Sequence, residues 1–292
     1  MPGNKKQMEA PLKIFYTGQL KGVLHIIPNS SAFVLTGADE SDIIIHNEPI
    51  QDKGRCNRLL KNISRQYMPY GKKVAVFIID DYERRYCQFD NLILLRTSMR
   101  ASKQRSNEIL LPYIWESPTH ALPVCEKGDK PAVAFCGLLS KHRAKIIKLF
   151  EKSPLVHCDF IKRTQFWGGQ PHASSLISEF YGNMLKSQFV ICNRGRGNFS
   201  IRFYQTLASG RIPVLVDTDM VLPFAEFINW NDLIVFEKNE KKCLEKVVAF
   251  FNQNDIAGAQ KRCSLVHEKF FSIENHFQFL ASLLRGKITA NQ

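Results

Sequence analysis

The chain has 292 residues, of which 45% are hydrophobic and 11% are aromatic. This length suits two domains of ordinary size or one large domain, and the composition excludes disordered and fibrous proteins. Lys and Arg number 40 against 27 Asp and Glu residues, which gives a formal net charge of +13. Such an excess favours anionic partners, namely nucleic acids, acidic membranes or phosphorylated small molecules.

The eight cysteines form no CxxC pair, so neither a zinc ribbon nor a redox motif is expected. Several lie in apolar runs, as Cys192 does, and we expect free thiols in a reducing compartment. The first residues lack the apolar core of a signal peptide, and no apolar run approaches the roughly 18 residues that cross a bilayer. We therefore expect a cytoplasmic protein with no transmembrane segment.

The first part of the chain combines apolar runs with one helical pattern. Strands are expected at residues 12–17, 33–36, 42–46, 74–79 and 92–95. Apolar side chains recur with helical spacing over 53–67. The run at 74–79 is apolar throughout and ends at Asp80 and Asp81, which is typical of a strand that is buried on both faces of a parallel sheet.

A polar stretch rich in proline and charge, between about 100 and 130, predicts a domain boundary near residue 125. Strands are then expected at 133–136, 156–160, 188–192, 212–216 and 233–236. Helices are expected at 141–152, 176–186, 200–209, 242–252, 256–271 and 274–284. This alternation predicts an α/β protein with two Rossmann-like, doubly wound domains, an N-terminal domain of residues 1–125 and a C-terminal domain of residues 126–292. The last helix of the C-terminal domain can also pack back on the N-terminal domain. In such folds ligands bind beyond the carboxyl ends of the strands, here in a central cleft that the two domains face.

The segment 187–216 reads as strand, glycine-rich turn, helix and strand. Gly195 and Gly197 allow a close approach of the backbone to a ligand. The helix that follows directs its free N–H groups and the positive end of its dipole at the turn, where an anion is the natural occupant. Three arginines add positive charge with a geometry suited to phosphate oxygens, namely Arg194, Arg196 and Arg202.

Other polar side chains of this segment have two readings each. Asn198 and Ser200 can cap the helix or donate to the ligand. On the helix, Phe199, Phe203 and Leu207 share one face and are expected in the core, while Arg202, Gln205 and Thr206 lie on other faces and can reach the cleft.

At these residues the sequence resembles the exostosin family of glycosyltransferases (GT47). The matching pieces, in the family's order and spacing, are residues 134–138 with Arg143, then 184–189, 194–203, 207–214, and 222–224 with 228–230. The resemblance implies a GT-B architecture with the nucleotide-sugar donor held by the C-terminal domain and the acceptor by the N-terminal domain. It implies an inverting transferase that uses a UDP-sugar, such as UDP-xylose or UDP-galactose, and an oligosaccharide or glycoprotein acceptor. Family members usually carry a membrane anchor in eukaryotes, and this chain looks more like the compact soluble versions of bacteria and large DNA viruses, the latter acting in the host cytoplasm.

The resemblance also implies which residues bind the donor. Gly137 and Arg143 would lie near the diphosphate, and the main donor loop would run from Arg194 to Arg202. The donor-binding set is thus expected to comprise Gly137, Arg143, Asn193, Arg194, Gly195, Gly197, Asn198, Ser200, Arg202 and Gln205. Family members commonly have Glu at the position of Gln205, which is expected to face the donor ribose; Gln can still hydrogen-bond a hydroxyl, but as a neutral group.

An inverting transfer needs a base for the acceptor hydroxyl, and the expected candidates are Asp80, Asp81 and Glu48, with His46 as a further alternative. Arginines and the helix N-terminus can stabilise the leaving diphosphate, so no metal and no further cofactor is expected. The Asp217-Thr-Asp219 sequence matches a metal motif of another glycosyltransferase architecture, but here a role in its loop or towards the acceptor is expected instead.

Two alternatives stay open. The charge of +13 permits a nucleic-acid-binding protein, although the chain has no recognisable binding motif and does not focus its basic residues on one element. The Gln205 departure permits a relative that binds a sugar nucleotide without catalysis.

Overall fold

The computed structural model describes residues 10–16, 27, 29–46, 48–50, 55–113, 121–170 and 173–289. The chain divides into two compact units. The first comprises Met1–Met99, Lys103–Ile114 and Ser272–Gln292, and the second comprises Arg100–Ser102 and Trp115–Phe271. The long segment of the second unit thus begins at Trp115, whereas the sequence predicted a domain boundary near residue 125.

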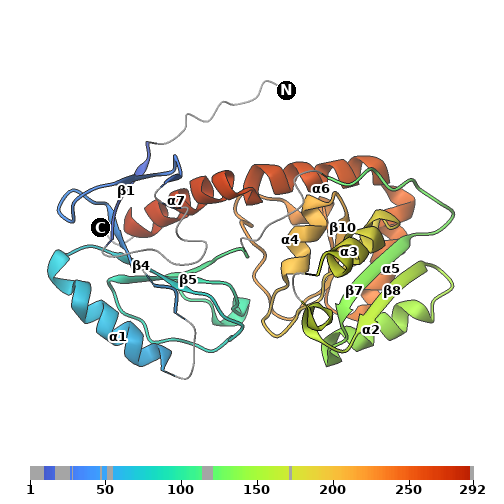
Figure 1. The fold of residues 1–292 in the computed structure, drawn as a ribbon, viewed down its shortest axis with the longest axis horizontal. Helices are drawn as coiled ribbons and strands as arrows, with labels where there is room; N and C mark the ends of the chain where they lie inside the picture. Colours follow the sequence, from blue (N-terminus) through green and yellow to red (C-terminus); the bar gives the residue numbers. More distant parts are fainter. Residues whose placement is uncertain are drawn as a thin grey trace. The chain divides into compact units, whose positions relative to one another are not determined.

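The first unit is built on a parallel sheet of six strands in the order β2-β1-β3-β4-β5-β6 (Figure 1). The strands are β1 (Leu12–Phe15), β2 (Phe33–Leu35), β3 (Ile43–Ile45), β4 (Val74–Ile78), β5 (Leu92–Arg96) and β6 (Glu108–Leu110). The first five confirm the expected strands. β6 was not predicted, because its three residues, Glu-Ile-Leu, are too few to show an alternating pattern.

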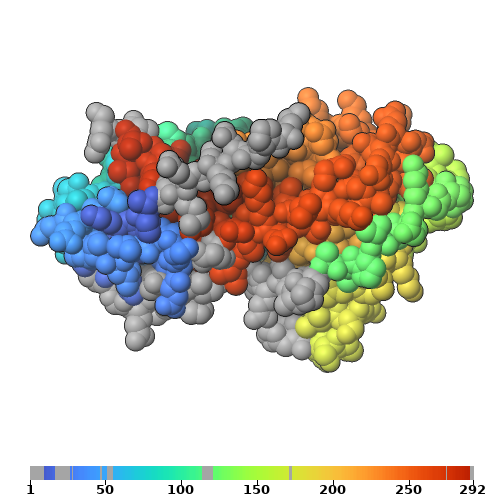
Figure 2. All heavy atoms as spheres, turned by 90° about the horizontal axis from the view of Figure 1, so that it is seen from above, coloured from blue at the N-terminus to red at the C-terminus, as the bar shows by residue number. Residues whose placement is uncertain are grey.

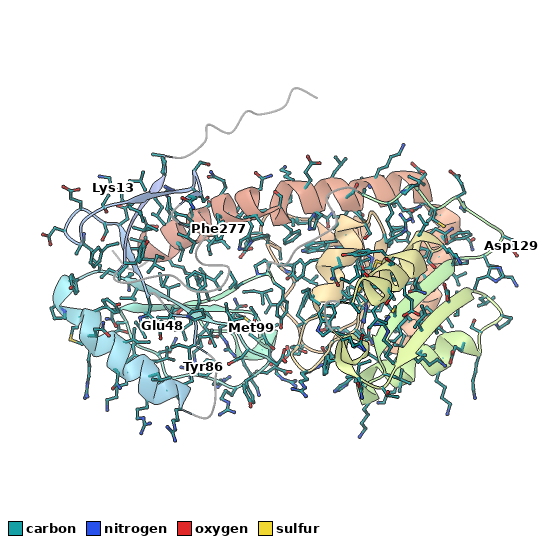
Figure 3. All side chains as sticks on the ribbon, viewed as in Figure 1. Lys13, Glu48, Tyr86, Met99, Asp129 and Phe277 are labelled. Carbon is teal, nitrogen blue, oxygen red and sulfur yellow. The ribbon has the colours of Figure 1, made fainter. Side chains whose placement is uncertain are left out.

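Helices cover both faces of this sheet, α1 (Cys56–Tyr67) on one side and α7 (Ile273–Thr289) on the other (Figure 1). Successive residues of a strand point to opposite faces. In β4, Val74 and Val76 therefore pack in the cluster that contains α1, and Ala75 and Phe77 pack in the cluster that contains α7. Phe277 is fully buried on the α7 side, where it points at the sheet (Figure 3). Burial on both faces explains why β4 is apolar throughout.

The second unit is built on a parallel sheet in the order β11-β10-β9-β7-β8. Its strands are β7 (Ala132–Leu138), β8 (His157–Arg163), β9 (Phe189–Ile191), β10 (Ile212–Val216) and β11 (Val235–Glu237). Its helices are α2 (Lys141–Glu151), α3 (Ser174–Leu185), α4 (Ile201–Ala208), α5 (Glu240–Gln253) and α6 (Ile256–Phe271). Short 3-10 turns are η2 (Met68–Tyr70) and η3 (Ala101–Lys103), then η4 (Phe166–Gly169) and η5 (Trp230–Asp232).

The order of strands in the second unit reverses between β7 and β9. From β7 the chain moves outward to β8, then returns to the other side of β7 and proceeds through β9 and β10 to β11. In open α/β sheets ligands bind at such a switch point, beyond the carboxyl ends of the two central strands. Gly137 lies at the carboxyl end of β7, and the turn of residues 193–200 follows β9, so both occupy this position.

The segment that leads into β7 is held in place within the second unit by a fully buried arginine, Arg211. Its guanidinium donates to the carbonyls of Met184, Leu185, Ser209, Gly210 and Pro123 and to the side-chain oxygen of Gln260. Gln260 in turn bonds both the N–H and the carbonyl of Cys125. Figure 2 shows this green stretch of chain lying along the orange-red helix α6.

Candidate active site

The site at the switch point is built around Gly137, whose φ of +150° is one that L-residues rarely adopt. A Cβ atom at this position would lie 2.2 Å from Nη2 of Arg202. The same Nη2 donates to the carbonyl of Cys136 at 2.6 Å. Glycine is therefore required here because the Arg202 guanidinium occupies the space that a side chain would fill.

Arg143 reaches the same place from the first turn of α2 and is buried. Its Nε donates to the carbonyl of Asn193 at 3.2 Å, and its Nη1 donates to the carbonyl of Leu138 at 3.0 Å. Its Nη2 lies 3.5 Å from the hydroxyl of Ser200. A Cβ atom at Gly195 would lie 3.5 Å from the same Nη2. Arg143 thus joins the end of β7 to the turn that follows β9.

The guanidinium of Arg202, on α4, has fewer hydrogen-bond partners than that of Arg143. It is 6% exposed, and within the described residues its Nε and Nη1 are buried without a hydrogen-bond partner. Both guanidiniums lie near one aromatic ring, since the Cζ atoms of Arg202 and Arg143 are 4.7 Å and 5.9 Å from the centroid of Phe135. Buried polar groups in proteins are normally paired, so two unpaired nitrogens on one guanidinium indicate a missing acceptor.

We call Arg143 and Arg202 the arginine pair. Burial, and to a smaller extent repulsion from Arg202, lower the pKa of Arg143 to about 9. Burial also lowers the pKa of Arg202. Among the described residues, the ionisable groups that act on the pair are arginines and two thiols whose pKa burial raises, with no carboxylate. Two buried cations without a counter-ion favour an anion that can bridge them.

The turn of residues 193–200, which we call the glycine–arginine turn, is fixed by its own side chains. Asn193 accepts from the N–H of Val216 through its side chain. Arg194 donates to Asn198 Oδ1 at 3.0 Å, and the amide of Asn198 donates to the carbonyl of Asp219 at 3.0 Å. Gly195 is half-buried and Gly197 is buried. Asn198 therefore links two loops at this edge rather than capping α4.

Ser200 was expected either to cap α4 or to donate to the ligand. It stands at the N-cap position, but its side chain makes no capping hydrogen bond. Its hydroxyl is instead placed beside Nη2 of Arg143. In the first turn of α4 the N–H of Phe203 donates to the carbonyl of Ser200 at 3.0 Å, and the glycine–arginine turn leads directly into this positive end of the helix dipole.

The rest of α4 is buried on almost every side. Phe203 lies in the core as expected, with its ring 5.2 Å from that of Trp230, which also contacts Phe271. Thr206 was expected to be able to reach the open side, but it is fully buried and lies 3.2 Å from the thiol of Cys192. Gln205 is buried too and is joined by a side-chain hydrogen bond to Tyr181 of α3.

Sequence reasoning missed the role of Phe135 and the contact of Tyr181. A signal for Phe135 was present, because it precedes Gly137 by two residues in a strand and must share its face of the sheet. No comparable signal existed for Tyr181, whose contact with Gln205 joins two helices that are distant in the sequence.

The three candidate bases belong to the first unit and lie at the carboxyl edge of its sheet. Asp80 and Asp81 follow β4, and Glu48 follows β3 (Figure 3). The two segments are neighbours, because Ile50 bonds backbone to backbone with Phe77 and Ile79. Glu48 and Asp81 are exposed and Asp80 is half-buried.

The environments of these carboxylates differ. Asp80 accepts from the N–H of Tyr82 through Oδ1, so it stabilises a turn. Asp81 lies 3.4 Å from the hydroxyl of Tyr113. Burial and the charge of Asp81 raise the pKa of Tyr113, which keeps this phenol protonated as a donor. Burial lowers the pKa of His46, and the negative charge of Glu48 partly offsets this effect.

The Asp217-Thr-Asp219 loop uses its carboxylates for its own structure. Asp217 accepts from the N–H of Asp219 at 2.7 Å, and Asp219 accepts from the hydroxyl of Ser102 at 2.5 Å. Within the described ranges, no group of three or more His, Cys, Asp or Glu residues is arranged to hold a metal ion. All eight cysteines are free, as expected.

Two parallel sheets, each with alternating helices, are the domain composition of the GT-B glycosyltransferases, and this confirms the expected fold class. The crystal form of the lipopolysaccharide outer core galactosyltransferase WaaB without ligand has the same fold, with a TM-score of 0.52 and 10% sequence identity. That match covers 94% of this chain and 100% of WaaB.

The chain belongs to the exostosin GT47 family. The family's domain, described as the Exostosin GT47 domain, matches residues 96–248, which include the arginine pair and the glycine–arginine turn. An Exostosin-1 homolog of Caenorhabditis elegans is 40% identical, with a match that covers 82% of this chain and 72% of the relative. A probable glucuronosyltransferase 47 A of Physcomitrium patens is 31% identical over 83 residues, which is 28% of this chain and 18% of the relative's own length. The chain therefore spans a small part of such plant relatives. Among the described helices, none is long and apolar enough to cross a membrane.

Proposed function

We propose that this protein is an inverting glycosyltransferase, which moves a sugar such as xylose or galactose from a UDP-sugar to a hydroxyl of an oligosaccharide or glycoprotein. The arginine pair carries this proposal: two buried guanidiniums at the switch point of the second unit, beside the N-terminus of α4 and without a carboxylate to balance them. A diphosphate supplies two adjacent anionic groups and can accept from both.

In the proposed reaction a base removes the proton of the acceptor hydroxyl, and the hydroxyl oxygen attacks the anomeric carbon of the donor. The bond from that carbon to the diphosphate oxygen breaks, and UDP leaves with the electron pair. Arg143 and Arg202 hold the negative charge that develops on the departing diphosphate, in a buried place where such charges interact strongly. Because these cations can take the role of a divalent ion, we propose that the transfer needs no metal.

The donor site can be tested by thermal shift and calorimetry with UDP. A ligand that binds the native state alone raises the melting temperature. UDP is expected to stabilise the protein, and Arg202→Ala is expected to remove that response. Arg262→Ala, which changes an exposed arginine of α6, is the matched control and should respond as the wild type does. Stabilisation by a DNA oligomer that survives raised salt, with no response to UDP, would favour the nucleic-acid alternative.

The base can be sought among the three carboxylates of the first unit with Asp80→Asn, Asp81→Asn and Glu48→Gln. Each variant should bind UDP as tightly as the wild type, because the carboxylates lie outside the donor unit. One of them should lose sugar transfer, measured as release of UDP in the presence of an acceptor panel and a chelator. Normal transfer by all three would place the base elsewhere, and wild-type UDP binding without transfer to any acceptor would favour a non-catalytic relative.

A further inference from the structure

A pair of exposed aromatic side chains follows β8 at the same edge of the second sheet as the arginine pair. Phe166 and Trp167 open the short turn η4, Phe166–Gly169, which we call the aromatic turn. Their side chains are 43% and 40% exposed. Large aromatic residues usually contribute to cores or to binding surfaces, so two adjacent exposed rings call for an explanation.

The backbone of the aromatic turn holds these rings at a cost. Trp167 has φ +53° and ψ +25°, and Gly168 and Gly169 continue at φ +62° and +81°. A bulky L-residue seldom adopts this left-handed conformation, and such strain concentrates at binding sites. The turn is also fixed in place, because a Cβ at Gly168 would lie 2.9 Å from the side chain of Leu176 on α3. The exposed indole is therefore positioned by the fold.

The aromatic turn is next to the residues that we assign to the diphosphate. The Cζ atom of Arg196, in the glycine–arginine turn, lies 5.2 Å from the ring centroid of Phe166. Strand β7, which carries Gly137, contacts η4 directly. The chain that leaves the aromatic turn forms α3, from which Tyr181 bonds to Gln205 of α4. The rings thus lie beside the glycine–arginine turn and against the strand that carries Gly137.

We infer that the aromatic turn stacks the base of the nucleoside diphosphate whose phosphates bind the arginine pair. This inference rests on the proposed function and adds to it the place of the nucleobase. A base is a flat π system, and an indole or phenyl ring beside a guanidinium offers it a matching surface. Such stacking accepts any base, so the turn contributes affinity for the nucleoside portion of the donor.

The test is Trp167→Asn, measured by calorimetry with three probes: inorganic pyrophosphate, UDP and a UDP-sugar. Asn tolerates the left-handed conformation, so this variant should keep the wild-type melting temperature. We expect its affinity for UDP to fall at least tenfold, which equals about 1.4 kcal/mol, with pyrophosphate binding unchanged. The matched control is Leu155→Ala, which removes an exposed apolar side chain just before β8, at the opposite edge of the sheet, and should change neither affinity.

Each contrary result has a distinct meaning. UDP binding unchanged in Trp167→Asn overturns the inference, and a loss confined to the UDP-sugar does so by assigning the ring to the transferred sugar. Equal losses of pyrophosphate and UDP overturn it as well, because the ring would then act through the anion site. A wild-type protein that binds pyrophosphate and UDP equally well also refutes base stacking while leaving the anion site intact. Failure of the wild type to bind any of the three probes refutes the proposed function itself, and the inference with it.

Discussion

Replacing Arg202 with methionine is expected to stabilise the protein in the absence of ligand while removing its response to UDP. Burial lowers the pKa of Arg202, because a charged guanidinium is disfavoured away from water. Taking one ion out of water costs several kcal/mol in a protein, even after the surroundings relax.

Methionine removes this cost for Arg202 and fills much of the same volume. It leaves the carbonyl of Cys136 without its hydrogen bond, which costs about 1–3 kcal/mol. The net gain is then about 2 kcal/mol or more, within the range observed when buried ionic groups are replaced by apolar ones. For a protein of this size that corresponds to a rise in melting temperature of roughly 5 °C.

The matched variant is Arg211→Met, which removes an equally buried guanidinium with the opposite expectation. Arg211 donates to five carbonyls and to Gln260, so its loss leaves several buried acceptors unpaired. The expected destabilisation is about 4 kcal/mol or more. The assay is calorimetric unfolding with and without UDP. Unfolding of Arg202→Met as early as that of Arg211→Met, or equal stabilisation of Arg202→Met and the wild type by UDP, would contradict an unbalanced Arg202 charge that binds the diphosphate.

Three further outcomes are expected. Gly137→Ala should displace the Arg202 guanidinium, since its Cβ would lie 2.2 Å from Nη2; UDP affinity measured by calorimetry should fall at least tenfold, and an unchanged affinity would contradict the geometry. The pKa of Arg143 is lowered to about 9, so the unfolded chain holds this proton more tightly, and the stability that Arg143 contributes at high pH is lost as the pH falls to about 9. UDP affinity should weaken by up to tenfold per pH unit above about 9; a titration that is flat to pH 10.5, or one that Arg143→Met does not flatten, would be inconsistent with a charged Arg143 in the site. Burial lowers the pKa of His276 from 6.5 to about 3, so the free energy of unfolding is highest above pH 6.5 and falls by roughly 3 kcal/mol at pH 4. The unfolding of His276→Leu should depend less on acid pH, and an acid profile equal to that of the wild type would refute this assignment.

The sequence predicted most of the helices and strands because their burial imposes a pattern. The run at 74–79 is apolar since β4 is covered on both sides, and α5 begins after the capping side chain of Asn239. Strand β6 could not be predicted from such a pattern, because it has three residues and one of them is a glutamate. Oε1 of this buried residue, Glu108, lies 2.7 Å from Nη1 of Arg96. An ion pair between two strands leaves no periodic trace in either of them.

The candidate site shows the same division. The glycines and arginines of the turn after β9 could be recognised locally, since a strand, a glycine-rich turn and a helix are consecutive in the sequence. The arrangement of the arginine pair over Phe135 could not, because it joins residues of β7, α2 and α4. The left-handed backbone at Trp167 was equally hidden, since nothing in a Phe-Trp-Gly-Gly sequence fixes the conformation of the tryptophan rather than of the glycines.

The position of α7 has a consequence for synthesis on the ribosome. Phe277, Leu280 and Leu284 complete one side of the core that β1 and β3 begin, although more than two hundred residues separate them in the chain. The strands of the first unit therefore keep one apolar face uncovered until the residues of α7 have been synthesised. The second unit is almost continuous in sequence and can close in the meantime. During that interval the uncovered apolar face of β1 and β3 is a surface that a chaperone can protect from aggregation.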